Sequence, residues 1–227
     1  MIFAAGFGTR MGALTAARPK PLIEVGGRPL IDHAIALARA AGVTRIVVNL
    51  HYRAAMLRAH LAGRDVLISE ETPDILETGG GLRAALPLLG EGPVFTMNAD
   101  AIWAGPNPLD LLARAWRAPR MEALLMCIPR RRALGHDGRG DFVIAPDGRA
   151  RRGRGLIFSG AQITRTERLH EIAQAAFSLN LLWDRMERSG GLFALPYPGR
   201  WCDVGRPEGI ALAEAMLAGA PPEIGDV

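Results

Sequence analysis

The chain has 227 residues, of which 49% are hydrophobic and 22% are charged, a composition typical of a globular protein. It contains no run of 18 apolar residues and no basic, cleavable leader, so the sequence predicts neither a membrane span nor a signal peptide. The two cysteines lack C-x-x-C spacing, which argues against a structural metal and favours a cytoplasmic protein.

The formal net charge of +4 suits an anionic partner. Nucleic acid is one such partner, but the arginines are scattered, with short clusters at 130–132 and 149–154 and no interleaved aromatic residues. Small phosphorylated substrates explain the charge at least as well, and a solvated surface explains most of it. We therefore expect no nucleic-acid partner.

The first predicted strand, Ile2–Ala5, runs into a turn with glycines at Gly6, Gly8 and Gly12. This strand begins almost at Met1, which leaves room for further residues upstream. Glycine lets backbone N–H groups approach a ligand, and successive N–H groups in a turn form an anion-binding concavity. An ordinary surface turn is the alternative interpretation of the glycines alone.

Cations in the same segment favour a phosphate site. Lys20 is the single lysine of the chain, and it lies between Pro19 and Pro21, which stiffen the backbone. Arg10 adds a second positive charge. The site is not a P-loop, because G-x-x-x-x-G-K-[ST] is absent, and Met11 replaces the third small residue of the dinucleotide fingerprint.

The next elements alternate between helix and strand. Apolar spacing predicts helices over Pro29–Ala41 and Tyr52–Ala62, and β-branched runs predict strands over Thr44–Leu50 and Asp65–Ser69. This order implies a parallel sheet with right-handed crossovers. The segment LETGGG at 76–81 is then expected to open a helix reaching Leu86, with bare N–H groups at its positive end, although a flexible loop fits the composition equally well.

A buried strand at Pro93–Asn98 leads into Asp100. A carboxylate just past the end of a central strand is typical of metal sites in α/β enzymes, although a cap or turn residue is the alternative. The remaining elements are expected at Asn107–Arg117 (helix), Glu122–Ile128 (strand), Pro129–Gly140 (loop), Asp141–Ala145 and Arg149–Arg151 (hairpin), Gly155–Thr164 (strand), Ser178–Arg188 (helix), Leu192–Tyr197 (strand) and Arg206–Ala218 (helix). The tail from Pro221 is expected to fray, and structural roles are expected for all five histidines.

Two stretches, AAGFGTRM and RPKPLIEVGGRPLID, together resemble the signature of the sugar-1-phosphate nucleotidyltransferases, also called nucleoside-diphosphate-sugar pyrophosphorylases. The segment WCDVGRPE resembles their second motif, W-x-D-V-G-T-P-E. The resemblance implies an α/β fold, a three-layer, doubly wound, Rossmann-like mixed sheet with a smaller β-rich sugar-binding portion. It also implies a single domain over 1–227, with a nucleotide-binding half to about 128 and a sugar-binding half after it.

The same resemblance implies Mg²⁺ as cofactor, held by Asp100 and Asp203, with Arg10 and Lys20 as catalytic cations. The residues implied to bind the nucleotide are Ala4, Ala5, Gly6, Gly8, Thr9, Arg10, Lys20, Glu77, Gly80, Gly81 and Asn98. Those implied to bind the sugar phosphate are Asp100, Gly140, Arg151, Arg152, Gly160, Asn180 and Asp203.

The chain departs from the family pattern in a few places. Ala13 replaces a frequent proline, and Ala99 precedes Asp100 where Gly or Ser is usual. The largest departure is the missing lysine that relatives often place after the hairpin to meet the sugar phosphate. Arg151 and Arg152 stand nearby, and we expect one of them to take that role.

The LETGGG segment looks most like that of the uridylyltransferases of muramate recycling, which implies UTP and N-acetylmuramate 1-phosphate as substrates. Mannose- or heptose-1-phosphate guanylyltransferases and phosphocholine-type cytidylyltransferases are the alternatives within the class. A regulatory subunit that senses nucleotide sugars is the alternative outside it, and a nicotinamide oxidoreductase fits less well. We expect a monomer or small homo-oligomer without a membrane partner.

Overall fold

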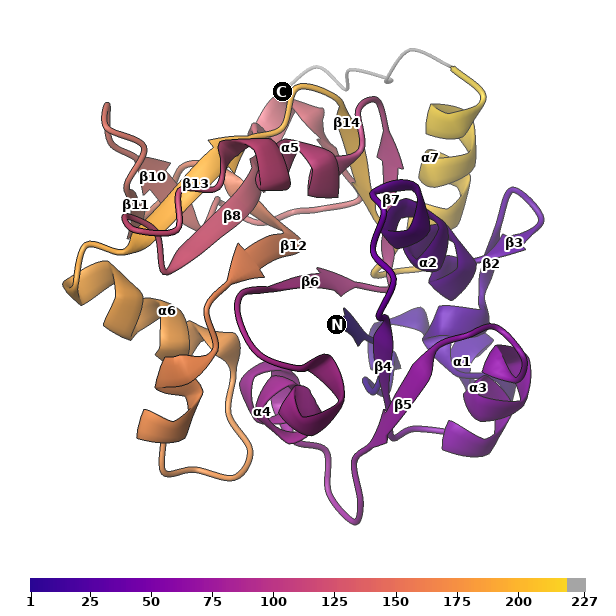
Figure 1. Ribbon diagram of the computed structural model, residues 1–227. Coiled ribbons are helices and arrows are strands. Elements are labelled where there is room, and N and C mark those ends of the chain that lie inside the picture. The colour runs from indigo at the N-terminus through magenta and orange to yellow at the C-terminus, as the bar shows by residue number, and fades with distance from the viewer. Residues whose placement is uncertain (220–227) are drawn as a thin grey trace.

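The computed structural model describes residues 1–219, so the tail from Pro221, predicted to fray, lies outside the described residues. The centre is a seven-stranded sheet in the order β13-β8-β12-β6-β1-β4-β5 (Figure 1). β12 runs antiparallel to its neighbours β6 and β8, whereas the other neighbouring pairs are parallel. The strands are β1 (Ile2–Phe3), β4 (Val47–Leu50), β5 (Leu67–Glu70), β6 (Val94–Asn98), β8 (Ala123–Ile128), β12 (Ile157–Thr164) and β13 (Leu192–Pro196).

Helices cover both faces of this sheet, which confirms the predicted three-layer fold. α2, α3 and α5 share one apolar cluster with the sheet, and α4 and α6 share another on the opposite face (Figure 1). The helices are α1 (Leu14–Ala17), α2 (Leu30–Ala40), α3 (Ala54–Leu61), α4 (Glu77–Leu89), α5 (Pro108–Ala115), α6 (Leu179–Arg188) and α7 (Glu208–Leu217), with short 3-10 turns at Thr9–Met11, Lys20–Leu22, Arg130–Arg132 and Glu167–Glu171.

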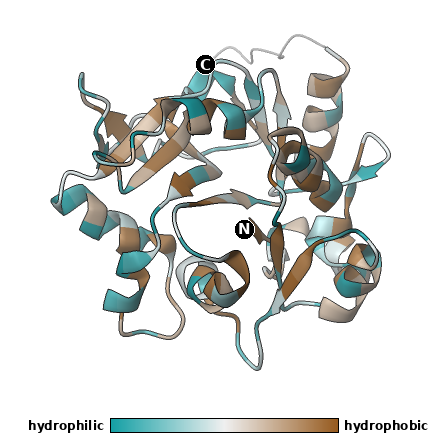
Figure 2. Ribbon diagram, in the orientation of Figure 1, coloured by the Kyte–Doolittle hydropathy of each residue, from teal (hydrophilic) through white to brown (hydrophobic). Residues whose placement is uncertain are grey.

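Strand β8 shows why the sheet is buried on both sides. Its residues Leu124 and Met126 pack into the first cluster, whereas Leu125 and Cys127 pack into the second. This alternation follows from the two-residue period of a strand. All six side chains of β8 are buried, so its sequence is continuously apolar. In Figure 2 hydrophobic colour predominates on the central strands such as β8, whereas the helices carry both hydrophobic and hydrophilic colour.

Smaller sheets surround this core. β7 (Ala101–Ala104), β14 (Arg200–Asp203) and β9 (Ala133–Leu134) form one of them, β10 (Phe142–Ile144) and β11 (Ala150–Arg152) form a hairpin, and β2 (Glu24–Val25) pairs with β3 (Arg28–Pro29). The predicted loop over 129–140 was wrong where β9 forms, because two residues are too few to show an alternating pattern.

Helix ends fall where capping chemistry puts them. Asn107 is the N-cap of α5 rather than its first residue, and its side chain accepts the N–H of Leu109 at 2.9 Å. Ser178 caps α6 in the same way, accepting the N–H of Asn180 at 3.2 Å. Within residues 1–219, no helix is both long enough and apolar enough to cross a membrane.

Candidate functional site

A cavity of about 300 Å³ opens where β1, β4 and β6 end. Ligands of open α/β sheets bind at this edge, outside the carboxyl ends of the strands. Many of the residues predicted to bind nucleotide or metal line it, namely Ala4, Ala5, Gly6, Gly8, Thr9, Arg10, Lys20, Glu77, Asn98 and Asp100. The glycine-turn motif that was predicted from the sequence therefore forms one wall of this cavity.

The glycine turn packs directly on Lys20. Gly8 has a φ of 64° in the left-handed region, and a Cβ there would lie 2.9 Å from the Cβ of Lys20. The hydroxyl of Thr15 donates to the Gly8 carbonyl at 3.2 Å and closes the turn. Glycine is required here for both conformation and space.

Lys20 meets Asp100 across the cavity. The Lys20 Nζ lies 2.7 Å from Asp100 Oδ2, and the Lys20 side chain is only 10% exposed. The two residues are 80 positions apart, so the fold and not the local sequence creates this ion pair. A largely buried ion pair needs accurate geometry, which the short turn between Pro19 and Leu22 supplies.

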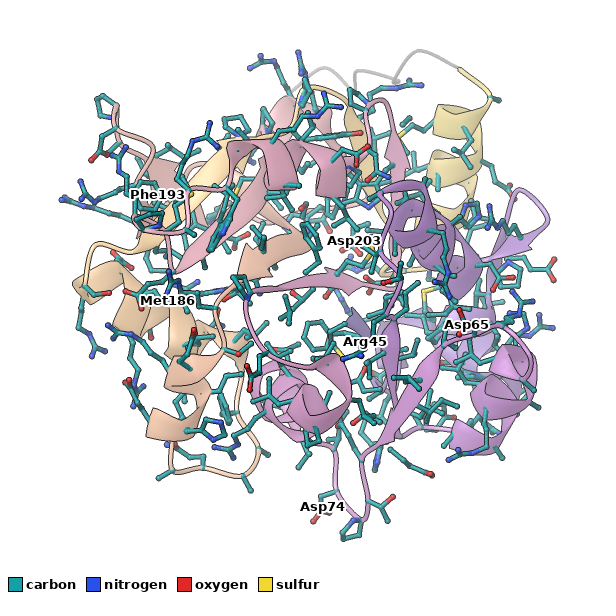
Figure 3. The ribbon with its side chains drawn as sticks, viewed as in Figure 1. Arg45, Asp65, Asp74, Met186, Phe193 and Asp203 are labelled. Atoms are coloured by element: carbon teal, nitrogen blue, oxygen red, sulfur yellow. The ribbon has the colours of Figure 1, made fainter. Side chains whose placement is uncertain are left out.

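Asp203 reaches the same place from the second half of the chain. Strands β14 and β7 pair antiparallel with Asp203 opposite Ala101, and the N–H of Val204 donates to the Asp100 carbonyl at 2.9 Å. Figure 3 shows Asp203 near the end of β6, at the centre of the molecule. The structure thus brings the two predicted metal aspartates together.

The surroundings of Asp203 disfavour the ionised form of its carboxyl group. Burial and then the neighbouring Asp100 raise the pKa of the Asp203 carboxyl above its usual range, while Lys20, Arg10 and His136 act in the opposite direction. Among residues 1–219, no three His, Cys, Asp or Glu side chains are placed to hold a metal by themselves. Two adjacent carboxylates nevertheless fit Mg²⁺, which proteins hold through one or two carboxylates together with substrate phosphates and water.

Gly205 explains part of the second motif. A Cβ at this position would lie 3.0 Å from Asp203 Oδ2 and 3.3 Å from Arg10 Nη2. Gly205 itself lines the cavity beside Arg10. The absence of a side chain therefore lets the guanidinium of the first motif approach the carboxylate of the second.

Gly160 supports the cavity from behind. It has a φ of 86° and lies where the register of β12 against β8 shifts, and a Cβ there would be 2.8 Å from the Asn98 Cγ. Asn98 lines the cavity, whereas Gly160 is not part of the lining. Because Gly160 has no side chain, it leaves the space that the side chain of Asn98 occupies at the end of β6.

The glycine run of LETGGG lies differently from the prediction. We predicted the glycines ahead of a helix, but Gly79, Gly80 and Gly81 are buried inside α4, and none lines the cavity. The N–H groups of Gly79 and Gly80 already donate to the carbonyl of Phe177, at 2.8 and 3.0 Å. Gly79 and Gly80 let α4 pack closely on the segment before α6. Of this motif, Glu77 and Thr78 line the cavity.

The predicted sugar-binding residues of the second half do not line this cavity. Arg152 donates to Asn180 Oδ1 at 2.8 Å and pairs with Asp184 at 3.3 Å, which ties β11 to α6. Arg151 is exposed on the same strand. Gly140, with a φ of 99°, packs on Gly155, because a Cβ there would lie 2.6 Å from the Gly155 nitrogen.

Sequence reasoning missed several residues at or beside the site, among them His136, Asn49 and Glu71. His136 was expected to be structural, but its Nδ1 lies 3.6 Å from Asp203 Oδ2. An ion pair of 3.1 Å between Arg206 and Asp137 holds the same loop against the start of α7. Asn49 and Glu71 also line the cavity, and both are buried. The polar Asn49 within the apolar strand VVNL is a signal that a closer inspection of the sequence offers; His136 has none.

Comparison with known proteins shows the family of the chain. Residues 1–185 match the MobA-like NTP transferase domain. The chain is 41% identical to N-acetylmuramate alpha-1-phosphate uridylyltransferase of Caulobacter vibrioides, over 97% of both chains. It is 34% identical to the protein of the same name from Neisseria meningitidis serogroup B, over 97% of this chain and 98% of the relative.

Solved structures share the fold at low identity. HddC from Yersinia pseudotuberculosis superposes with a TM-score of 0.76 at 22% identity, covering 95% of this chain and 97% of that one. A putative glucose-1-phosphate thymidylyltransferase from Bacillus anthracis superposes with a TM-score of 0.78 at 15% identity, covering 99% of this chain and 96% of that one.

The fold and the site define a nucleotidyltransferase, as predicted. The chain belongs to the MobA-like NTP transferase family and, within it, to the sugar-1-phosphate nucleotidyltransferases.

Proposed function

We propose that the protein transfers UMP from UTP to N-acetylmuramate 1-phosphate and releases pyrophosphate. The observation that carries this proposal is the 41% identity to the Caulobacter vibrioides uridylyltransferase over 97% of both chains. The cavity supports it, because Lys20, Arg10 and the glycine turn that the family signature contains lie together there.

The reaction forms a bond from a phosphate oxygen of the sugar 1-phosphate to the α-phosphorus of the nucleotide, and it breaks the bond from that phosphorus to the leaving pyrophosphate. The attacking oxygen is already anionic, so no general base is needed. Catalysis then consists of positioning and of charge stabilisation. Lys20 and Arg10 would stabilise the charge that develops on pyrophosphate.

Asp100 and Asp203 would hold Mg²⁺ in this reaction. When bound, the ion supplies charge neutralisation between the phosphate groups. Asp203 and the adjacent Asp100 would be the protein groups that hold the ion, a donor set that fits Mg²⁺ because proteins bind it through one or two carboxylates together with substrate phosphates and water. We also propose that Arg151 or Arg152 binds the sugar phosphate. His136, which lies beside Asp203, is a further candidate hydrogen-bond donor to that phosphate.

The test is pyrophosphate release from the purified protein with each of four nucleoside triphosphates and a panel of sugar 1-phosphates, with and without Mg²⁺. We expect the highest kcat/KM with UTP and N-acetylmuramate 1-phosphate. A preference for GTP and mannose 1-phosphate supports the second candidate. This candidate rests on a 28% identical relative from Oryza sativa, named as a probable mannose-1-phosphate guanylyltransferase, of which the chain covers 61%.

We propose a cytoplasmic location and a monomer or small homo-oligomer. Absence of pyrophosphate release with all nucleotides and sugars, together with nucleotide-sugar binding, would support a sensing subunit instead. The joint presence of Lys20, Asp100 and Asp203 weighs against that role.

A further inference from the structure

A series of hydrogen bonds runs along the wall of the cavity and connects two loops that are distant in sequence. The N–H of Ala4 donates to Asn49 Oδ1 at 2.7 Å, and Asn49 Nδ2 donates to Glu71 Oε1 at 2.6 Å. The N–H of Leu76 donates to the other oxygen, Glu71 Oε2, at 2.7 Å. These bonds connect the end of β1 to the residue that precedes α4.

Burial makes these bonds costly to break. Glu71 is 2% exposed and Asn49 is 3% exposed. A buried carboxylate is stable only while donors satisfy its oxygens, and here the donors are a side-chain amide and a backbone N–H. If either loop moved away, Glu71 would keep its burial and lose a donor. The pair Asn49 and Glu71 therefore fixes the distance between the glycine-turn side and the α4 side of the cavity.

The same hydrogen bonds hold the segment that leads into an unusual backbone conformation at Glu77. Glu77 has a φ of 58°, a left-handed conformation that residues other than glycine rarely adopt. Leu76, directly before it, is held on two sides, because its N–H donates to Glu71 and its carbonyl accepts the N–H of Phe177 at 3.1 Å. Glu77 and Thr78 line the cavity just after this anchored residue. Strained backbone of this kind persists only where the surroundings hold it, and it is frequent at ligand sites.

Gly81 fits the same arrangement. A Cβ at this position would overlap Glu71 Oε1 and would lie 3.0 Å from Asn49 Nδ2. The glycine thus leaves the space that the buried carboxylate and amide occupy. Figure 3 shows the loop between β5 and α4 with Asp74 at its outer tip, so Glu71 and Leu76 lie on its two returning arms.

We propose that Asn49 and Glu71 are positioning residues of the nucleotide subsite. They hold the Ala4–Gly6 turn and the Leu76–Thr78 segment in one geometry, so that a nucleotide contacts both. This inference rests on the proposed nucleotide binding in the cavity. It adds that Asn49 and Glu71 hold two walls of the cavity in position before the nucleotide binds. We therefore expect that a substitution which leaves Asn49 or Glu71 without its hydrogen-bond partner weakens nucleotide binding and leaves sugar 1-phosphate binding unchanged.

The proposal can be tested by exchanging the carboxylate and the amide between positions 49 and 71. Glu71→Gln places an NH₂ group against one of the two donors, so one hydrogen bond is lost. Asn49→Asp places a second carboxylate against Glu71 Oε1. In the double variant, the introduced carboxylate accepts from both Ala4 and the introduced amide, whose oxygen accepts from Leu76. Every donor then has an acceptor again, with the net charge unchanged.

We expect each single variant to raise KM for the nucleotide by at least about tenfold, with KM for the sugar 1-phosphate within about twofold of wild type. The double variant should return the nucleotide KM to within about threefold. Glu70→Gln is the matched control, because Glu70 is the exposed neighbour that pairs with Arg58, and it should leave both KM values unchanged. Unchanged nucleotide KM in the single variants, or no recovery in the double variant, would overturn the proposal, even if melting temperatures fell.

A measurement on the wild-type protein covers the case in which the single variants do not fold. UTP without sugar should slow hydrogen exchange at the N–H groups of Ala4 and Leu76 together, in an NMR experiment on ¹⁵N-labelled protein. Protection of only one of them would contradict the coupling. If UTP does not bind wild type, the UTP assignment fails by itself, and the exchange experiment is done with the nucleotide that wild type turns over.

Discussion

At the scale of single residues, the site brings together two like-charged carboxylates, Asp100 and Asp203, and places cations beside them. Lys20 lies 2.7 Å from Asp100, and Asp203 shares their environment from another strand. Lys20 is the only lysine of the sequence and, among residues 1–219, one of the few buried charged residues. A compact ammonium on a flexible stem can serve a carboxylate and a phosphate oxygen in turn.

Lys20→Ala should lower kcat/KM by at least about a hundredfold, the effect of removing one transition-state charge contact. Pyrophosphate release gives the rate, and circular dichroism shows whether the fold is intact. Arg18→Ala, an exposed cation two residues away, is the control and should change little. Near-normal turnover of a folded Lys20 variant would remove this residue from the site.

Asp203→Asn should abolish Mg²⁺-dependent activity and, without ligands, raise the melting temperature at pH 7. Burial and Asp100 raise the pKa of Asp203, so its charged form destabilises the fold at every pH above the folded pKa, and a neutral side chain removes that cost. Calorimetry without Mg²⁺ measures the change, and each kcal/mol corresponds to about 2–4 °C in a domain of this size. The gain should stay constant above the folded pKa of the carboxyl, shrink as the pH falls through that pKa, and vanish below the ordinary pKa of an aspartate.

Asp100→Asn should also abolish activity, and the double variant with Asp203→Asn should lose no more than either single one. Both carboxylates would serve one ion, so their effects do not add. Isothermal titration with Mg²⁺ and a nonhydrolysable nucleotide measures binding separately. Full activity of either variant at low Mg²⁺ would exclude the two-aspartate site.

At the scale of elements, the hairpin of β10 and β11 is joined to α6 by Arg152. Its guanidinium lies 4.8 Å from the ring centre of Phe142 and 5.3 Å from that of Trp183, in addition to its contacts with Asn180 and Asp184. Arg151, one position earlier, is also exposed, but within residues 1–219 it makes no comparable hydrogen bond, ion pair or ring contact. The two arginines that are equivalent in sequence are thus different in the structure.

Arg152→Ala should lower stability by about 1–2 kcal/mol, from the lost cation–π contacts and ion pair. Arg151→Ala is the natural control and should leave the melting temperature unchanged. Measuring KM for the sugar 1-phosphate in the same two variants tests whether either arginine holds the sugar phosphate. A rise in this KM in one variant, with the nucleotide KM steady, is the result expected for that role.

At the scale of the whole molecule, both halves of the chain build one sheet and one cavity. β12 and β13 of the second half continue the sheet begun by β1, β4 and β6, and Gly205 of the second half lines the cavity beside Arg10. A ligand bound between them should stabilise the molecule as a unit. At 100 times its Kd, a nucleotide with Mg²⁺ should add about 2.7 kcal/mol, which raises the melting temperature by about 5–10 °C. A shift confined to one of two separate transitions would contradict a single cooperative unit.

The sequence alone determined the class of fold, the glycine turn and the chemistry of the charged residues. Periodicity in segments such as 29–41 and 44–50 is a local property, because the buried face of each element repeats along its own chain. The motifs around Lys20, Asp100 and Asp203 likewise identified a nucleotidyltransferase. Strands of two residues, such as β9, carry too short a pattern to be predicted.

The tertiary structure alone decided which of these residues meet. Gly80 was expected to contact the ligand, but its N–H already donates to Phe177, almost a hundred positions away. His136 carries no local signal, yet it lies beside Asp203. Asn49 and Glu71 become a connected pair only when β4 and β5 align. Such contacts depend on distances between elements, which packing of the whole core fixes and which no local pattern of the sequence encodes.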